Sequence, residues 1–205
     1  MHRPEFVRFW LKELHPPLEV QSLLRNGYIP DLASWPPEAE LPNNASARAR
    51  ENEKFLDVEI AELVASGAVS VVTRKPWCFN PLQVVTREGK KKRLVMDVSR
   101  TINEHIQQEK VKLTSLEQIT ENASQGDFFA SSDMRKGYYH IKINEKYRRL
   151  FGIKWKGQFY LWNCCFLGLR DLVLKFTKFV KPIICLLYTS PSPRDLSTSR
   201  MPSSA

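Results

Sequence analysis

The sequence predicts an α+β fold, because hairpin patterns and helical patterns occupy different parts of the chain. Residues 79–86 and 93–98 are short apolar runs that flank a turn at Gly89, which is typical of a β-hairpin. Residues 151–155 and 158–163 flank a shorter turn and predict a second hairpin.

Helical spacing of apolar residues predicts longer helices on either side of these strands. The helix predicted over residues 47–65 carries Leu56, Ile60, Leu63 and Val64 at that spacing. The helix predicted over residues 169–184 carries Leu172, Phe176, Phe179, Val180 and Ile183. Shorter elements are also predicted: a helix near 6–14, a strand at 69–73, a helix at 115–123 with a Thr114–Glu117 capping box, and a basic helix at 144–150.

Charge and cysteine usage limit the class of protein. The 205 residues include 31 Lys and Arg against 22 Asp and Glu, a formal net charge of +9, which suits a polyanionic partner but also an ordinary basic protein. The cysteines at 78, 164, 165 and 185 form no C-x-x-C motif, so we expect reduced, buried thiols in an intracellular protein. We expect no membrane association, because signal-peptide and membrane-spanning patterns are absent from the sequence.

Composition divides the chain into three regions. Residues 1–45 are rich in proline, which predicts an extended lead-in, and residues 46–184 carry the remaining predicted helices and strands. Residues 185–205 are rich in Ser, Thr, Pro and Arg without apolar periodicity, so we expect them to be disordered. This last region resembles a translated cloning adapter, which indicates a non-native tail; a natural disordered tail is the alternative.

The segment from Asp127 to Ile143 is the part of the chain that most suggests chemistry. Its first half alternates in side-chain direction, which predicts a strand that ends at Asp133, and the pattern breaks at Gly137. A carboxylate at the end of a buried strand needs a partner. A divalent metal ion, an arginine or a helix N-terminus would serve, and a turn-forming or capping role is the further alternative.

Residues 133–141, Asp-Met-Arg-Lys-Gly-Tyr-Tyr-His-Ile, resemble the first palm segment of retrotransposon reverse transcriptases. The resemblance implies that Asp133 is catalytic and is one ligand of a two-metal Mg²⁺ site, assisted by the backbone carbonyl of Met134. It also implies that the ring of Tyr138 lies under the sugar of the incoming dNTP and excludes a 2′-hydroxyl. From the residue alone, an ordinary core tyrosine is the favoured interpretation of Tyr138.

An upstream segment, residues 92–103, resembles the fingers segment of the same family. The resemblance implies that Arg93 grips the triphosphate, and a bidentate guanidinium suits phosphate oxygens. Arg100 and Asn103 stand one position later here than in the family, and Lys90 and Lys91 are interpreted as a solvated turn.

Two more segments follow the family's order. Residues 79–85 resemble its N-P-L-x-V strand, and residues 165–178 resemble the segment whose glycine, here Gly168, approaches the incoming base and the template. Phe166 stands where the family usually has proline, and Leu172-Val173 where it has Ala-Pro.

Taken together, these segments resemble the fingers and an incomplete palm of a right-hand polymerase fold, most similar to the DIRS-like group of retroelements. The family's third palm segment, which carries an Asp-Asp pair, has no counterpart here, so we expect this chain to be inactive as it stands. The implied partners are an RNA template, an RNA–DNA hybrid and dNTP. The alternative function is a non-catalytic, basic nucleic-acid-binding fragment.

Overall fold

The computed structural model describes residues 4–107, 115–121, 124–126 and 133–189, and it has the predicted α+β fold. The α-helices are α1 (Pro4–Glu13), α2 (Leu18–Asn26), α3 (Ala45–Arg48), α4 (Glu53–Ala65), α5 (Leu116–Glu121) and α6 (Leu172–Thr189). Three 3₁₀-helices are η1 (Arg50–Asn52), η2 (Gly137–His140) and η3 (Glu145–Leu150). The strands are β1 (Ala39–Glu40), β2 (Val69–Val72), β3 (Cys78–Phe79), β4 (Leu82–Val85), β5 (Arg93–Met96), β6 (Gly152–Trp155) and β7 (Gln158–Trp162).

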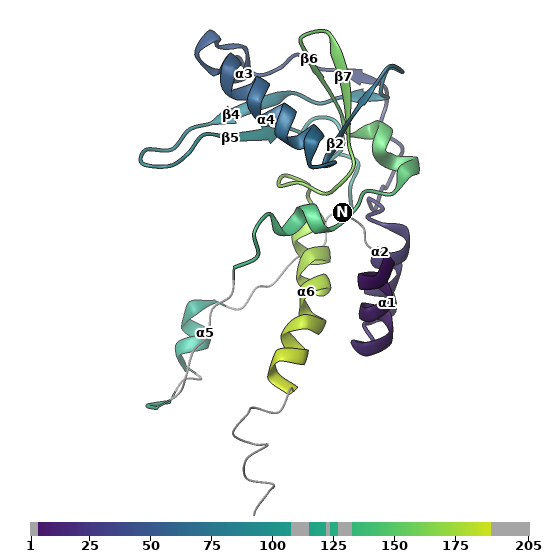
Figure 1. The fold of residues 1–205 in the computed structure, drawn as a ribbon, viewed down its shortest axis with the longest axis vertical. Coiled ribbons are helices and arrows are strands. Elements are labelled where there is room, and N and C mark those ends of the chain that lie inside the picture. The colour runs from purple at the N-terminus through teal and green to yellow at the C-terminus, as the bar shows by residue number, and fades with distance from the viewer. Residues whose placement is uncertain (1–3, 108–114, 122–123, 127–132, 190–205) are drawn as a thin grey trace, which may run out of the picture.

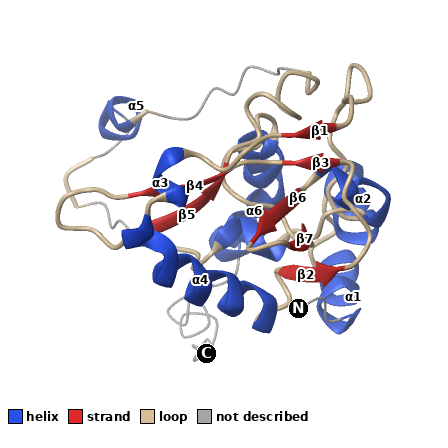
Figure 2. Ribbon diagram, turned by 90° about the horizontal axis from the view of Figure 1, so that it is seen from above, coloured by secondary structure: helices blue, strands red, loops and turns tan. Residues whose placement is uncertain are grey.

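The strands gather at one end of the molecule, and α1, α2 and α6 extend away from them (Figure 1). A mixed sheet has the order β1-β3-β6-β7-β2, while β4 and β5 form a separate antiparallel hairpin. Seen from above, α4 runs along one side of the strands, between the β4–β5 hairpin and β2 (Figure 2). Helix α3 contacts β4 and α4 contacts β2, so these helices connect the hairpin to the sheet.

One hydrophobic core joins the strands to the helices that extend away from them. It includes Leu56 of α4, Met96 of β5, Ile153 of β6 and Leu172 of α6, all of which are buried. On the helical side, the ring of Trp10 in α1 stacks on Phe179 of α6 with centroids 4.8 Å apart.

The lead-in region differs from the prediction. The helix expected near residues 6–14 is present as α1, but the Pro-rich stretch also contains a second helix, α2, which begins directly after Pro17 and ends at Gly27. Pro before the first turn and Gly after the last are the ordinary boundaries of a helix.

The prediction of one continuous helix over residues 47–65 is wrong, because α3, η1 and α4 occupy this region. Extended backbone at Ala49 separates α3 from η1 and α4. Side-chain hydrogen bonds stabilise the break: the Asn52 amide donates to the Ser46 carbonyl at 2.9 Å, and the Ser46 hydroxyl accepts from the Val84 amide at 3.1 Å. Within α4 the predicted apolar face is confirmed, since Leu56 and Ile60 are buried in the core.

The strand predicted over residues 79–86 is divided between two sheets. β3 pairs with β1 and β6, whereas β4 pairs with β5. Pro81 lies between them and cannot donate a backbone hydrogen bond, so the ladder is interrupted there.

The remaining predicted elements are confirmed with adjusted ends. Both hairpins form, β4 with β5 and β6 with β7. The basic helix at 144–150 is the 3₁₀-helix η3. The C-terminal helix α6 runs to Thr189, so the prediction of disorder is wrong for residues 185–189, which continue this helix.

Some predictions fall outside the described residues. They include the strand leading to Asp133, the proposed cap at Thr114 and residues 190–205 of the tail. At α5 the described residues form a capping box one position later, because Ser115 and Gln118 exchange hydrogen bonds of 3.0 and 3.3 Å.

Candidate functional site

The five predicted site residues lie on three separate parts of the fold. Arg93 is exposed at the start of β5, and Asp133 and Met134 are exposed on the segment that leads into η2. Tyr138 is half-buried within η2, and Gly168 is exposed shortly before α6. The structure brings Gly168 to β5 and Tyr138 to α6.

Gly168 connects residues 165–178 to the β4–β5 hairpin. Its φ of +121° favours glycine, and a Cβ atom there would lie 3.6 Å from the Met96 carbonyl at the end of β5. The Asn103 amide donates to the Gly168 carbonyl at 2.7 Å, and the Asn103 side-chain oxygen accepts from the Arg170 backbone amide at 3.0 Å. Two of the segments singled out from the sequence are therefore joined by hydrogen bonds through Asn103.

Tyr138 is held by an aromatic contact with α6. Its ring meets the ring of Phe176 edge to face, with centroids 4.8 Å apart. The following residue, Tyr139, instead meets Trp162 of β7, with centroids 5.8 Å apart. The two neighbouring tyrosines therefore pack against different elements, and Tyr138 is partly a core residue, as its residue type alone suggested.

The metal-binding capacity of the described residues is limited. Among them, no group of three His, Cys, Asp or Glu side chains is arranged to hold a metal ion. Asp97, a carboxylate within residues 92–103, accepts hydrogen bonds from the Ser99 hydroxyl at 2.6 Å and from the Ser99 backbone amide at 3.0 Å. These hydrogen bonds lower the pKa of Asp97, and they hold its carboxylate in a local turn with Ser99. A two-metal site needs several converging oxygen ligands, and the described residues show no such group.

Asn80 of the N-P-L-x-V segment has a structural role that the sequence did not reveal. It is buried, and its amide donates to the carbonyls of Leu150 and Gly152 at 2.9 and 3.0 Å. Its oxygen accepts a short hydrogen bond from the Thr101 hydroxyl. A single buried amide thus joins the strand segment, the fingers segment and the β6 hairpin.

A buried polar cluster at Asp171 was also missed. The Tyr28 hydroxyl donates to Asp171 at 2.6 Å, and Lys175 forms an ion pair with the other carboxylate oxygen at 2.7 Å. The Lys175 ammonium also donates to the Ile29 carbonyl at 2.6 Å and lies 4.6 Å from the centre of the Tyr28 ring. Burial, followed by the nearby Asp171 carboxylate, raises the pKa of Tyr28 well above its usual value. The i,i+4 spacing of Asp171 and Lys175 is a local signal, but Tyr28 is too distant in sequence to be expected.

Sequence comparison finds no relative. No family model matches the chain. No curated protein matches it either.

Comparison of structures does find similar proteins. The foamy viral protease–reverse transcriptase in complex with dsDNA superposes with a TM-score of 0.60 at 16% identity, over 92% of this chain and 42% of that one. The fold is that of a reverse transcriptase. A selenomethionine-labelled prototype foamy virus protease–reverse transcriptase gives a TM-score of 0.58 at 18% identity, over 82% of this chain and 22% of that one. The foamy viral protease–reverse transcriptase in complex with an RNA/DNA hybrid gives a TM-score of 0.56 at 15% identity, over 92% of this chain and 27% of that one.

The reverse-transcriptase fold covers most of this chain but a minor part of each similar structure, between 22% and 42% of the three. The predicted fold, fingers with part of a palm, agrees with that relation.

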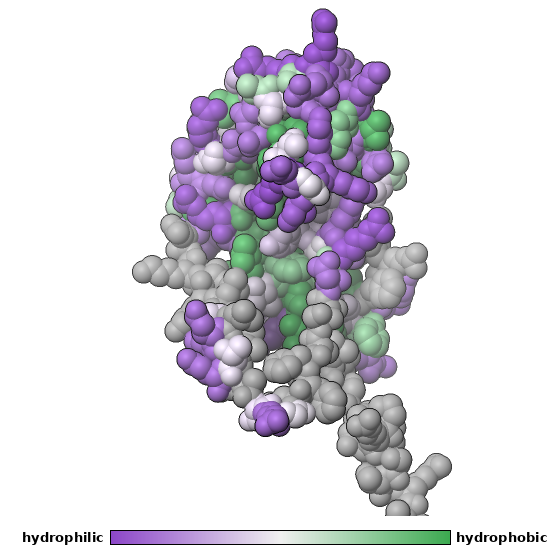
Figure 3. All heavy atoms as spheres, turned by 90° about the vertical axis from the view of Figure 1, so that its left-hand side faces the viewer, coloured by the Kyte–Doolittle hydropathy of each residue, from purple (hydrophilic) through white to green (hydrophobic). Residues whose placement is uncertain are grey.

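The surface seen in Figure 3 is largely hydrophilic in its upper part, and apolar side chains gather below the β4–β5 hairpin. Met134 and Leu167 are among the exposed large apolar residues.

Three free cysteines, Cys78, Cys164 and Cys165, are buried as predicted. Within the described part of the chain, no helix combines the length and apolar character needed to cross a membrane.

Proposed function

We propose that this chain is the fingers and first part of the palm of a retrotransposon RNA-directed DNA polymerase, and that it binds the incoming nucleotide. The observation that carries the proposal is the reverse-transcriptase fold found at 15–18% identity, together with four family-like segments in the family's order. Assignment to the DIRS-like group rests on the residue motifs alone.

The nucleotide site would be formed by three segments. Arg93 would bind the triphosphate, because its guanidinium is exposed and can make paired hydrogen bonds to phosphate oxygens. Tyr138 would lie beneath the sugar, and its contact with Phe176 fixes one edge of its ring. Gly168, adjacent to β5, would lie close to the base and template.

Asp133 would be one ligand of a Mg²⁺ site, which would neutralise phosphate charge when complete. Its exposed position on the segment before η2 is compatible with that role. The described residues do not supply the other carboxylates, so no chemical step is assigned to this chain. The proposed partners are dNTP, an RNA template and an RNA–DNA hybrid, and the proposed location is intracellular.

A second candidate function is nucleic-acid binding without catalysis. The observation that favours it is that the described residues contain no group of three His, Cys, Asp or Glu side chains arranged to hold a metal ion. The two functions differ in whether a free nucleotide binds.

Titration of the chain with a fluorescent dNTP and the matching rNTP tests the proposal. We expect dNTP to bind more tightly than rNTP. Arg93→Gln should weaken both, and Tyr138→Ala should reduce the preference for dNTP. A Lys91→Gln variant is the matched control, since Lys91 is an exposed cation on the same hairpin. Equal losses in Arg93→Gln and Lys91→Gln would remove the triphosphate assignment.

A further inference from the structure

A basic groove lies at the junction of α2, η2 and η3. It consists of two adjoining hollows of about 340 and 400 Å³ that share Lys142 and Arg148 in their walls. The cationic residues that line it come from segments distant in sequence: Arg25, Arg135, Lys136, Lys142 and Arg148.

The charge of the groove is strongly unbalanced. Among its described lining residues Glu145 is the only carboxylate, against five Lys and Arg residues. Glu145 lies 3.7 Å from Arg148, but its side chain is 88% exposed, so solvent screens the pair. The excess of positive charge favours a ligand with several negative charges.

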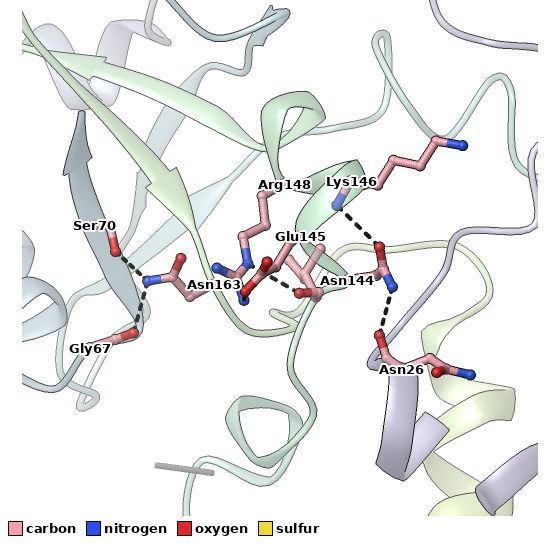
Figure 4. Close-up of polar contacts among 9 residues, drawn as sticks. Asn26, Gly67, Ser70, Asn144, Glu145, Lys146, Arg148 and Asn163 are labelled. Atoms are coloured by element: carbon pink, nitrogen blue, oxygen red, sulfur yellow. Dashed lines mark hydrogen bonds and ion pairs between the residues drawn. The ribbon is translucent and has the colours of Figure 1, made fainter. Parts of the chain in front are cut away.

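Hydrogen bonds fix the walls of the groove before any ligand binds. The Arg148 Nε donates to the Ile143 carbonyl at 3.1 Å, and the side chain is 23% exposed. Figure 4 shows Arg148 between Asn163 on one side and Asn144 on the other. Asn163 donates to Gly67 and Ser70 at 3.0 and 2.6 Å.

The α2 side of the groove is fixed in the same way. Asn144 donates to the Asn26 carbonyl at 2.8 Å, at the end of α2 (Figure 4). The Tyr28 backbone amide donates to the Lys142 carbonyl at 2.6 Å. A pre-formed site loses less conformational entropy on binding.

The lining also indicates what kind of anion fits. Tyr139 lies in the wall of the first hollow, with the Lys136 ammonium 5.6 Å from the centre of its ring. Proteins that bind single-stranded nucleic acid combine a basic groove, which contacts phosphates, with aromatic rings on which bases stack, and this lining has both features. Each hollow has the size of a pocket for one small group, and a duplex would not place its bases there. None of the exposed large apolar side chains lines the groove, which argues against a lipid surface.

We propose that the basic groove binds a segment of single-stranded nucleic acid, with phosphates at Lys142 and Arg148 and a base against Tyr139. The groove differs from the proposed nucleotide site, because its lining contains none of the residues assigned to that site: Arg93, Asp133, Met134, Tyr138 and Gly168. The proposal does not depend on polymerase activity or on Asp133.

Fluorescence anisotropy with a labelled single-stranded 12-mer at several salt concentrations tests the proposal. Lys142→Gln and Arg25→Gln are the main variants, because Arg148 supports the backbone and its replacement would disturb the fold. Lys54→Gln is the control of equal charge: Lys54 is exposed on α4, roughly 18 Å along the helix from the groove wall at Ser66.

We expect Lys142→Gln to weaken binding several-fold and to reduce the slope of log affinity against log salt by about 0.7. Lys54→Gln should have a clearly smaller effect. Equal effects of the two variants would overturn the proposal, as would Lys142-dependent binding of anionic phospholipid vesicles without binding of the 12-mer.

Crosslinking locates the ligand independently of any substitution. A 12-mer with photoreactive bromouridine should crosslink to the peptide that contains Tyr139. Crosslinks confined to the β4–β5 hairpin would overturn the proposal. The Arg93→Gln variant should keep this crosslink, so failure of the nucleotide-binding proposal and failure of the groove proposal give different results.

Discussion

The Tyr28–Asp171–Lys175 cluster holds α6 against the rest of the fold, and removing its carboxylate should be strongly destabilising. The Tyr28 side chain is fully buried and the Asp171 side chain is 5% exposed, while that of Lys175 is 27% exposed. Asp171→Ala leaves a buried hydroxyl without its acceptor and a partly buried ammonium without its counter-ion. Leaving a buried polar group unpaired costs about 1–3 kcal/mol, and breaking a buried ion pair about 3–5 kcal/mol.

We expect Asp171→Ala to lower the free energy of unfolding by about 3 kcal/mol. The value lies at the lower end of the range for a broken buried ion pair, because Lys175 reaches solvent and retains its bond to Ile29. Tyr28→Phe, which removes the hydroxyl and keeps the ion pair, should cost about 1 kcal/mol. In the double variant the two costs should not add, because both changes remove the same hydrogen bond.

Equilibrium unfolding in urea, followed by tryptophan fluorescence, measures these free energies. A loss of about 3 kcal/mol would move the midpoint by roughly 1–2 M urea. Glu62→Ala, at an exposed position of α4, is the control for a helical carboxylate and should change stability little. An Asp171→Ala protein as stable as this control, or strictly additive costs in the double variant, would refute the reasoning.

Three further predictions follow from the fold. Gly27 has φ +77° and ψ −178°, and a Cβ atom there would lie 2.8 Å from the Lys142 carbonyl, so Gly27→Ala should lower the free energy of unfolding by about 2 kcal/mol in the same urea assay. Burial raises the pKa of Cys78 from 9.0 to about 11 and that of Cys164 to about 12. The unfolded state therefore loses these thiol protons at lower pH than the folded state does, and the free energy of unfolding should fall as pH rises from 9 to 12. Cys164→Ala should reduce this fall, and a pH profile of stability that the substitution leaves unchanged would contradict the prediction. In primer extension with dNTPs and Mg²⁺ or Mn²⁺ we expect no product from this chain, and product that Asp133→Ala abolishes would show that further carboxylates complete the site.

Local patterns predicted the elements whose signals are local. The two hairpins followed from apolar runs around short turns, and the α4 face followed from the spacing of Leu56 and Ile60. Helix α2 had a local signal as well, with Pro17 before it and Gly27 after it, but the abundance of proline suggested an extended chain instead.

The features that were missed depend on contacts between distant segments. The break after α3 is stabilised by Asn52, whose side-chain oxygen also accepts from Lys92 at 2.6 Å. The structural role of Asn80 requires Thr101 and the β6 hairpin to be in place. Family resemblance identified the segments around Asn80 and Asn103, but the tertiary structure was needed to show that these amides connect the segments.

The roles predicted for the site residues stay predictions. The structure shows Gly168 beside β5 and Tyr138 packed against Phe176 of α6. The placement of Arg93 and Asp133 around one nucleotide stays a prediction.

Photolabelling with two reactive dNTPs tests most directly whether these segments form one nucleotide site. One probe carries its reactive group on the base and the other on the γ-phosphate. We expect the base probe to label peptides that contain Tyr138 or Gly168, and the phosphate probe to label the β4–β5 hairpin at Arg93. Unlabelled dNTP should protect both sites better than rNTP. Labelling of both probes only around Arg25 and Lys142, with no protection at Arg93, would contradict the assignment of this chain as the nucleotide-binding part of a polymerase.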